Sequence, residues 1–248
     1  MPTTVSEPGE AERVPSFEAA CETHQQVFFS HDALRLYWTL NGSLTSAISV
    51  MDYKFYDPDS PIAQSPLTEP KTSSVTVGVE QLDDWKDQWM ELHRDHAIPG
   101  PHNDESDEAR FGSLSDFDSD SEEGPEHLLR CCRGDRPRKT KVSLTVNATK
   151  GFLTVHDYVS AVHPWLLALR EKILQASGDL QDNVPLPSDT KLMITSYLSP
   201  DLLVTVEEER WKRDKSKKEN MKFGQQIEAW NKQRAQEDQE LWEQEQGW

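Results

Sequence analysis

Hydrophobic positions recur along the chain with two different periods, and these periods predict most of its secondary structure. In residues 34–40 leucine and tryptophan occupy every second position, and "SVTVGVE" at 74–80 is rich in β-branched residues, so both runs are expected to form strands. Asn41-Gly42 separates the first run from "SLTSAISVMDYKFY", which predicts a β-hairpin. "HLLRCC", "KVSLTVNA" and "GFLTV" predict further short strands.

A helical period is found in residues 80–95. Leu82, Trp85, Trp89 and Leu92 recur at spacings that place them on one face of a helix. Prolines and a glycine in the following "HAIPGPH" predict that the helix stops there.

The second helical segment has a capping-box-like start, with Asp157 three residues after Thr154, and ends near Gly178, a residue suited to a helix C-terminus. Its apolar residues form one continuous stripe that keeps its phase across Pro164, which predicts a single helix with a kink; they are Tyr158, Val159, Val162, Trp165, Leu166, Leu169, Ile173 and Ala176. His156, His163 and Arg170 align along a bordering stripe. Two helical turns, about 10 Å, separate the histidines, so both cannot ligate one metal ion. We expect them to lie at the edge of a core.

This strand–turn–helix element, with its "TVHDYV…HPWL", resembles uncharacterised domain families of fungal genomes in which a "TVxDV" strand end leads into an amphipathic helix. The resemblance covers residues 141–174. It implies an α+β fold and no catalytic activity.

The end of the chain predicts a hairpin and then a long helix. "KLMITSYL" and "LLVTVEEE" are the expected strands, although Ser199-Pro200-Asp201 leaves open whether 199–206 is a strand or a helix start. Residues 207–246 are dense in charged residues and glutamine and contain no proline, which favours a helix. Four apolar residues of this helix share a narrow stripe that could dock on a partner: Phe223, Ile227, Trp230 and Leu241. Trp211, near the start of the helix, is a further candidate interaction residue.

Composition changes this picture by predicting disordered segments. Leu, Ile, Val and Phe make up about 21% of the 248 residues and the formal charge is −18, a combination only just above the apolar content typical of disordered proteins. Eight tryptophans nevertheless indicate a real core. The segment 100–126 is dominated by acidic residues and cannot bury enough surface to offset its ordering entropy. Ser113, Ser115 and Ser119 each precede an acid by three residues, which predicts phosphorylation by acidophilic kinases.

These features together predict an α+β fold of short antiparallel strands and hairpins packed with amphipathic helices and interrupted by an acidic disordered insertion. The expected organisation is a disordered tail (1–23), a first half-domain (24–99), the acidic insertion (100–126), a second half-domain (127–206) and a charged C-terminal helix (207–248). Whether the two halves form one domain or two is left open.

Candidate chemistry is sparse. His93 and His96 lie one helical turn apart beside Asp95 and are the candidate metal ligands. Cys131 and Cys132 lack the spacing of zinc or redox motifs, and neighbours in a strand point to opposite faces, so we expect one thiol buried and one exposed. No glycine-rich phosphate loop or nucleophile motif occurs in the sequence. We therefore assign no catalytic residue and no cofactor.

Charge and cysteine usage indicate the cellular setting. Three cysteines, two of them adjacent, make a poor disulfide framework, and no apolar run is long enough for a membrane span. We therefore expect an intracellular protein, cytoplasmic or nuclear. The favoured function is a non-catalytic interaction or scaffold module for an unknown, basic protein partner. The alternatives are a nuclear accessory protein that contacts nucleic acid through basic clusters 130–141 and 210–218, and a metal-assisted hydrolase.

Overall fold

The structure, a computed structural model, describes residues 13–50, 54–96, 109–112, 127–132, 134–138, 142–182, 184–195 and 199–215. The chain divides into two compact units, Met1–Thr205 and Val206–Trp248. The first predicted half-domain and the second up to Thr205 belong to the first unit. The fold is α+β, as the sequence predicts. No described helix has both the length and the apolar composition needed to cross a membrane.

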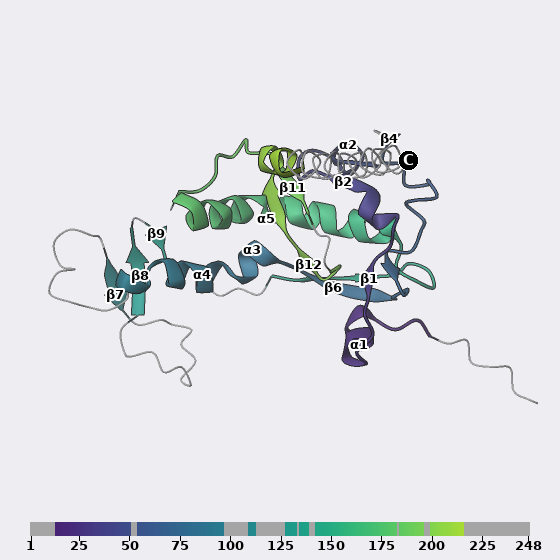
Figure 1. The fold of residues 1–248 in the computed structure, drawn as a ribbon, viewed down its shortest axis with the longest axis horizontal. Helices are drawn as coiled ribbons and strands as arrows, with labels where there is room; N and C mark the ends of the chain where they lie inside the picture. The colour runs from purple at the N-terminus through teal and green to yellow at the C-terminus, as the bar shows by residue number, and fades with distance from the viewer. Residues whose placement is uncertain are drawn as a thin grey trace, which may run out of the picture. The chain divides into compact units, whose positions relative to one another are not determined.

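A three-stranded sheet in the order β10-β6-β12 joins distant parts of the first unit (Figure 1). Its central strand β6 (Ser74–Val79) has alternating burial, with all three valines fully buried, as its β-branched pattern predicts. Strand β10 (Leu144–Asn147) pairs with β6 antiparallel, and β12 (Leu202–Leu203) pairs with it in parallel. The pairing with β10 shows that the two sides of the acidic segment share one sheet.

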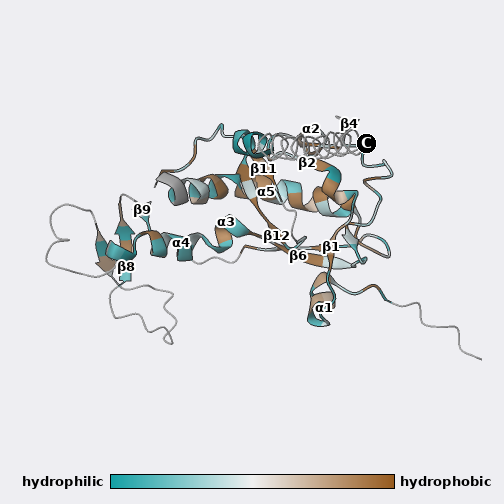
Figure 2. Ribbon diagram, viewed as in Figure 1, coloured by the Kyte–Doolittle hydropathy of each residue, from teal (hydrophilic) through white to brown (hydrophobic). Residues whose placement is uncertain are grey.

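Helix α5 (Val155–Asp182) packs on this sheet and supplies much of the core. It is continuous through Pro164, so the prediction of one helix is confirmed. Figure 2 shows hydrophobic residues along α5 and along the neighbouring strands. Most of the predicted stripe is buried, including Val162, Leu166 and Ile173 at 0% exposure, whereas Trp165 and Leu169 are half-buried. The helical period therefore identified the core-facing side.

The predicted end of this helix at Gly178 is wrong. Helix α5 runs on to Asp182, and Gly178 lies buried inside it. A Cβ atom at Gly178 would collide with the backbone of Val184, Pro185 and Leu186. Glycine is needed here because the returning chain passes directly over the helix, which a local sequence pattern does not reveal.

The predicted first hairpin is present, but its turn is not the expected one. Strands β2 (Leu36–Trp38) and β3 (Ile48–Val50) pair antiparallel, with Trp38 opposite Ile48, and β4 (Lys54–Phe55) pairs with β3. Instead of a two-residue turn, the connection contains the short helix α2 (Leu44–Ala47). Gly42 has a φ of +78°, so the glycine serves a longer loop in the left-handed region.

The helical segment after β6 is broken into shorter pieces. Helices α3 (Glu80–Asp83) and α4 (Trp85–Leu92) meet at Asp84, and a 3-10 turn, η2, covers Arg94–His96. Trp89 is buried, but Leu92 is 57% exposed, so Leu92 does not belong to the predicted core face. Leu92 is the last residue of α4 and lies at its exposed end.

Another small sheet, in the order β7-β8-β9, lies beside α4 (Figure 1). Strand β8 (His127–Cys131) pairs with both β7 (Arg110–Gly112) and β9 (Gly134–Asp135). Strand β7 falls within the segment predicted to be disordered; residues 100–108 and 113–126 lie outside the described part. The buried hydrophobic residues of this region are Trp89, Leu128 and Cys131, a cluster separate from the main core.

The predicted disordered tail also contains a helix. Helix α1 (Phe17–Glu22) is capped at its N-terminus by Ser16, whose Oγ accepts a hydrogen bond from the N–H of Ala19. Glu18 Oε1 accepts a hydrogen bond of 2.6 Å from the N–H of Thr76 in β6, and Phe17 is buried in the main core. These contacts order the tail from residue 13 onward.

The remaining segments are short. Residues 199–206, which could have been a strand or a helix start, contain strands, and the N–H of Thr195 donates to the Val204 carbonyl, as the predicted hairpin requires. Residues 208–215 are helical, which agrees with the start of the predicted C-terminal helix. "GFLTV" forms an isolated bridge at Thr154 and no strand. The other elements are β1 (Phe28–Phe29), η1 (Ala33–Arg35), β5 (Thr68–Glu69), β11 (Leu192–Ile194) and β13 (Thr205–Glu207).

Candidate functional site

The polar stripe of α5 faces other segments of the same unit. His163 is 2% exposed; its Nδ1 accepts a hydrogen bond from Trp38 Nε1 at 3.0 Å, and its Nε2 donates to the Gly42 carbonyl at 3.0 Å. Because the indole N–H can only donate, His163 is the neutral tautomer with its proton on Nε2. Both ring nitrogens are used to tie α5 to the β2–β3 hairpin.

The other two members of the stripe also have structural partners. His156 Nδ1 lies 2.9 Å from the Tyr56 hydroxyl, and the two rings stack. Burial raises the pKa of Tyr56 above its ordinary range, so the phenol remains protonated. Arg170 donates to the carbonyls of Ser188 and Thr190 at 2.7 and 2.6 Å. The stripe of His156, His163 and Arg170 therefore packs against other segments of this chain.

The start of α5 is a reciprocal capping box, as the sequence predicts. The N–H of Asp157 donates to Thr154 Oγ1, and both the N–H and the hydroxyl of Thr154 donate to Asp157 Oδ2. Thr149 donates to the other carboxylate oxygen at 2.8 Å. Burial raises the pKa of Asp157, but these hydrogen bonds outweigh burial and leave the pKa below its ordinary value.

A small apolar hollow opens to solvent on the first unit. Its lining comes from the turn η1, from α5 and from short strands on either side of α5 in the sequence. The lining residues are Phe29, Ala33, Leu34, Leu36, Trp38, Leu67, Tyr158, Ile194 and Leu203. Trp38 and Tyr158 are almost fully buried and form an edge-to-face pair, whereas Leu34 is 37% exposed. The hollow therefore has a fixed aromatic wall and an accessible aliphatic rim.

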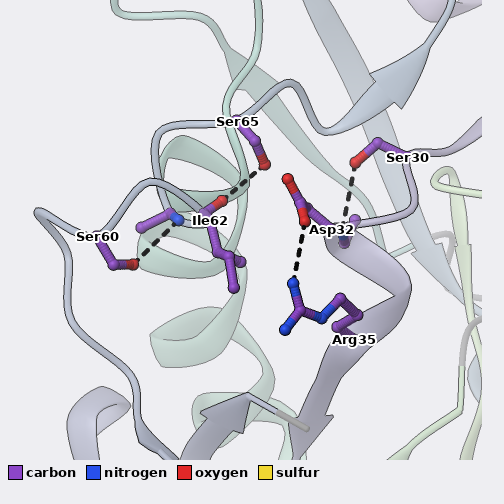
Figure 3. A network of polar contacts seen from close by, with 8 residues as sticks. Ser30, Asp32, Arg35, Ser60, Ile62 and Ser65 are labelled. Atoms are coloured by element: carbon purple, nitrogen blue, oxygen red, sulfur yellow. Dashed lines mark hydrogen bonds and ion pairs between the residues drawn. The ribbon is translucent and has the colours of Figure 1, made fainter.

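Short polar contacts hold this rim in place (Figure 3). Ser30 Oγ accepts a hydrogen bond of 3.2 Å from the N–H of Ala33 and so caps the 3-10 turn that carries Leu34. Arg35 reaches back to Asp32 at 3.5 Å across the same turn. Figure 3 also shows the neighbouring loop, where Ser60 and Ser65 make similar local hydrogen bonds to Ala63 and Ile62. Leu34 is thus presented by a turn with satisfied backbone groups.

A second candidate site lies where α4 meets the small sheet. A ring nitrogen of His93 and the sulfur atoms of Cys131 and Cys132 all lie within 4.8 Å of one another. His93 and Cys131 are buried, and Cys132 is half-buried. The His93 ring stacks on Trp89 at a centroid distance of 4.3 Å, and its Nδ1 lies 2.8 Å from the Trp89 carbonyl.

The two adjacent cysteines do not point to opposite faces, which corrects the expectation from strand geometry. Strand β8 ends at Cys131, and Cys132 has a φ of +47°, in the left-handed region. This turn brings the two sulfur atoms to 3.6 Å from each other. A strand end followed by a left-handed residue has no clear sequence signal when that residue is not glycine.

Of the predicted metal ligands, the structure brings only His93 into this cluster. His96 ends the turn η2, but its side chain lies outside the described part. Sequence reasoning missed the two cysteines as partners of His93 because the contact depends on the packing of β8 against α4. Asp179 in α5 accepts a hydrogen bond of 3.2 Å from Trp85 Nε1, and burial raises the pKa of its carboxyl despite that bond and the nearby His93.

The predicted interaction and modification residues are mostly outside the described part. Trp211 is described: it is half-buried, and Lys215 Nζ lies 5.1 Å from the centre of its ring. The residues outside are Phe223, Ile227, Trp230, Leu241, Ser113, Ser115 and Ser119. In the basic cluster 130–141, Arg136 is buried and Arg130 lies 3.8 Å from Asp135, so neither side chain is fully available to a phosphate.

No protein-family model, curated protein or solved structure matches the chain. The resemblance to fungal domain families stays a prediction.

Proposed function

We propose that the chain is a non-catalytic interaction module that binds a basic protein segment through the apolar hollow. The single observation that carries this proposal is the hollow itself, with an aromatic wall of Trp38 and Tyr158 and the exposed rim residue Leu34. Recognition surfaces typically combine a buried aromatic pocket with an accessible apolar rim, because a partner side chain loses water on all sides there.

The size and charge of the surface support this choice of partner. The hollow is small and its lining is mostly apolar, so it suits the end of a single apolar side chain. The chain has a formal charge of −18, which attracts basic partners over a distance and repels acidic ones. A segment that combines Lys or Arg with an apolar anchor meets both conditions.

The use of polar side chains in α5 supports a non-catalytic role. His163, His156 and Asp157 are engaged in hydrogen bonds that hold the fold together. An intracellular setting also fits the three cysteines, which are present as free thiols.

The proposal is tested by selecting peptides from a random displayed library on the full chain and measuring their affinity. We expect enriched peptides to contain basic residues and a bulky apolar anchor. Leu34→Asp puts a charge on the rim and is expected to weaken binding of an enriched synthetic peptide at least tenfold, which is about 1.4 kcal/mol. Increasing salt is expected to weaken binding as well.

Leu92→Asp is the matched control, because Leu92 is an exposed leucine that does not line the hollow. It is expected to leave the affinity unchanged. The proposal is overturned if no peptide is enriched, or if the two variants affect the affinity equally.

A further inference from the structure

The geometry at the junction of α4 and the small sheet points to a metal site. We propose that His93, Cys131 and Cys132 bind one Zn²⁺ ion, which fastens β8 to the end of α4. The three side chains come from two segments that are distant in sequence and adjacent in the fold.

The donor set is the first argument. Two thiolates and one imidazole are the soft and borderline ligands that zinc takes in proteins. Two thiolates on one tetrahedral zinc ion, each about 2.3 Å from the metal, lie about 3.8 Å apart. The sulfur atoms of Cys131 and Cys132 lie 3.6 Å apart, close to that separation. All three donors lie within 4.8 Å, so small side-chain rotations complete the site.

The orientation of His93 is the second argument. Because a carbonyl oxygen only accepts hydrogen bonds, the contact of 2.8 Å between Nδ1 and the Trp89 carbonyl places the ring proton on Nδ1. The lone pair for a metal is then on Nε2. Histidines that ligate metals usually donate their other ring N–H to a carbonyl or carboxylate in this way, which fixes the tautomer and the ring. Stacking on Trp89 restricts the ring further.

The size of the local core is the third argument. Among the described residues, the buried members of this cluster are Trp89, Leu128 and Cys131. So little apolar burial gives a small sheet little stability of its own, and small protein units commonly add a structural metal to compensate. Binding Zn²⁺ to two thiols and a neutral imidazole releases two protons, and the resulting centre carries no net charge. Water or another ligand takes the fourth position.

The test uses the reduced full chain, stripped of metal with a chelator and titrated with Co²⁺ and then with Zn²⁺. We expect one equivalent of Co²⁺ to bind, with the thiolate-to-cobalt charge-transfer absorption of two sulfur ligands and the visible bands of tetrahedral cobalt. Zn²⁺ is expected to displace Co²⁺, and a weakly buffered titration is expected to show two protons released per zinc. Zinc is also expected to raise the thermal midpoint of the wild-type chain.

Variants identify the ligands. Cys132→Ser and His93→Gln are each expected to weaken cobalt and zinc binding at least tenfold and to reduce the zinc-dependent rise in the thermal midpoint. Cys21→Ser is the matched control, since Cys21 is an exposed cysteine in α1, and it is expected to bind as wild type does. Circular dichroism of each metal-free variant separates loss of a ligand from loss of the fold.

Several results would overturn the proposal. These are the absence of stoichiometric zinc binding, selective binding of Cu(I) without zinc, an affinity that is insensitive to His93→Gln in a folded variant, or an effect of Cys21→Ser equal to that of Cys132→Ser. If a variant does not fold, the wild-type cobalt spectrum still decides, because a spectrum without two thiolate ligands contradicts the assignment.

Discussion

Replacing His163 with leucine should destabilise the first unit through one stranded hydrogen-bond donor. The substitution introduces an apolar side chain of similar size and removes both ring nitrogens. The Trp38 indole N–H, buried with its partner, then has no acceptor, and a buried unsatisfied donor costs about 1–3 kcal/mol. The Gly42 carbonyl is on an exposed residue, so water replaces that contact at little cost. We therefore expect a loss of about 2 kcal/mol.

Urea denaturation followed by tryptophan fluorescence measures this loss, and for a unit of this size about 2 kcal/mol lowers the thermal midpoint by roughly 4–8 °C. Trp38→Phe, which removes the donor, serves as the second arm of a double-mutant cycle. In the Trp38→Phe background, His163→Leu should cost about 1 kcal/mol less than in the wild type, since no donor is left stranded. A cost below about 0.5 kcal/mol for the single variant, or a cycle without coupling, would refute the reasoning.

Two further predictions concern the ends of α5. The lowered pKa of Asp157 means that the unfolded chain binds more protons than the folded one in acid. The carboxylate therefore contributes stability at neutral pH that is lost as the pH falls below about 4. On acidification the urea midpoint should fall less steeply for Asp157→Asn than for the wild type, and equal slopes would contradict this. Gly178→Ala should destabilise the unit by about 1–3 kcal/mol in urea denaturation, because the added methyl group meets backbone, although alanine favours helices. Gly151→Ala, where nothing lies within 4 Å, is the matched control and should cost less than about 0.5 kcal/mol; equal effects would count against the steric argument.

The elements that could be predicted from the sequence are those whose pattern is local. The stripe along α5 and the alternation in β6 both reflect burial on one side of a regular element. Such a period can be recognised in the sequence even when the segment that packs against the element is unknown. The capping box at Thr154 and Asp157 was predictable for the same reason, because its two partners are three positions apart. The pairing of β2 with β3 followed from neighbouring runs, but the loop between them did not.

The features that could not be predicted depend on tertiary contacts that leave no periodic pattern or motif in the sequence. Gly178 is conformationally ordinary within its helix, and only the chain that crosses over it explains why glycine stands there. The cluster of His93 with Cys131 and Cys132 depends on two events, the packing of β8 against α4 and the left-handed turn at Cys132. Neither leaves a period or a motif in the sequence.

The position of β6 has a consequence for the order in which the chain assembles during synthesis. Its neighbour β12 is among the last described elements to be made, and Gln81, just after β6, is joined to a residue 124 positions later by hydrogen bonds to its backbone. Until β12 has been synthesised, the edge of β6 that pairs with β12 is open, and an open strand edge can pair with another chain. Helix α1 is made earlier, and its Glu18 carboxylate already accepts the Thr76 N–H of β6. Helix α1 can therefore cover part of this edge on the nascent chain while the rest of the sheet is still being translated.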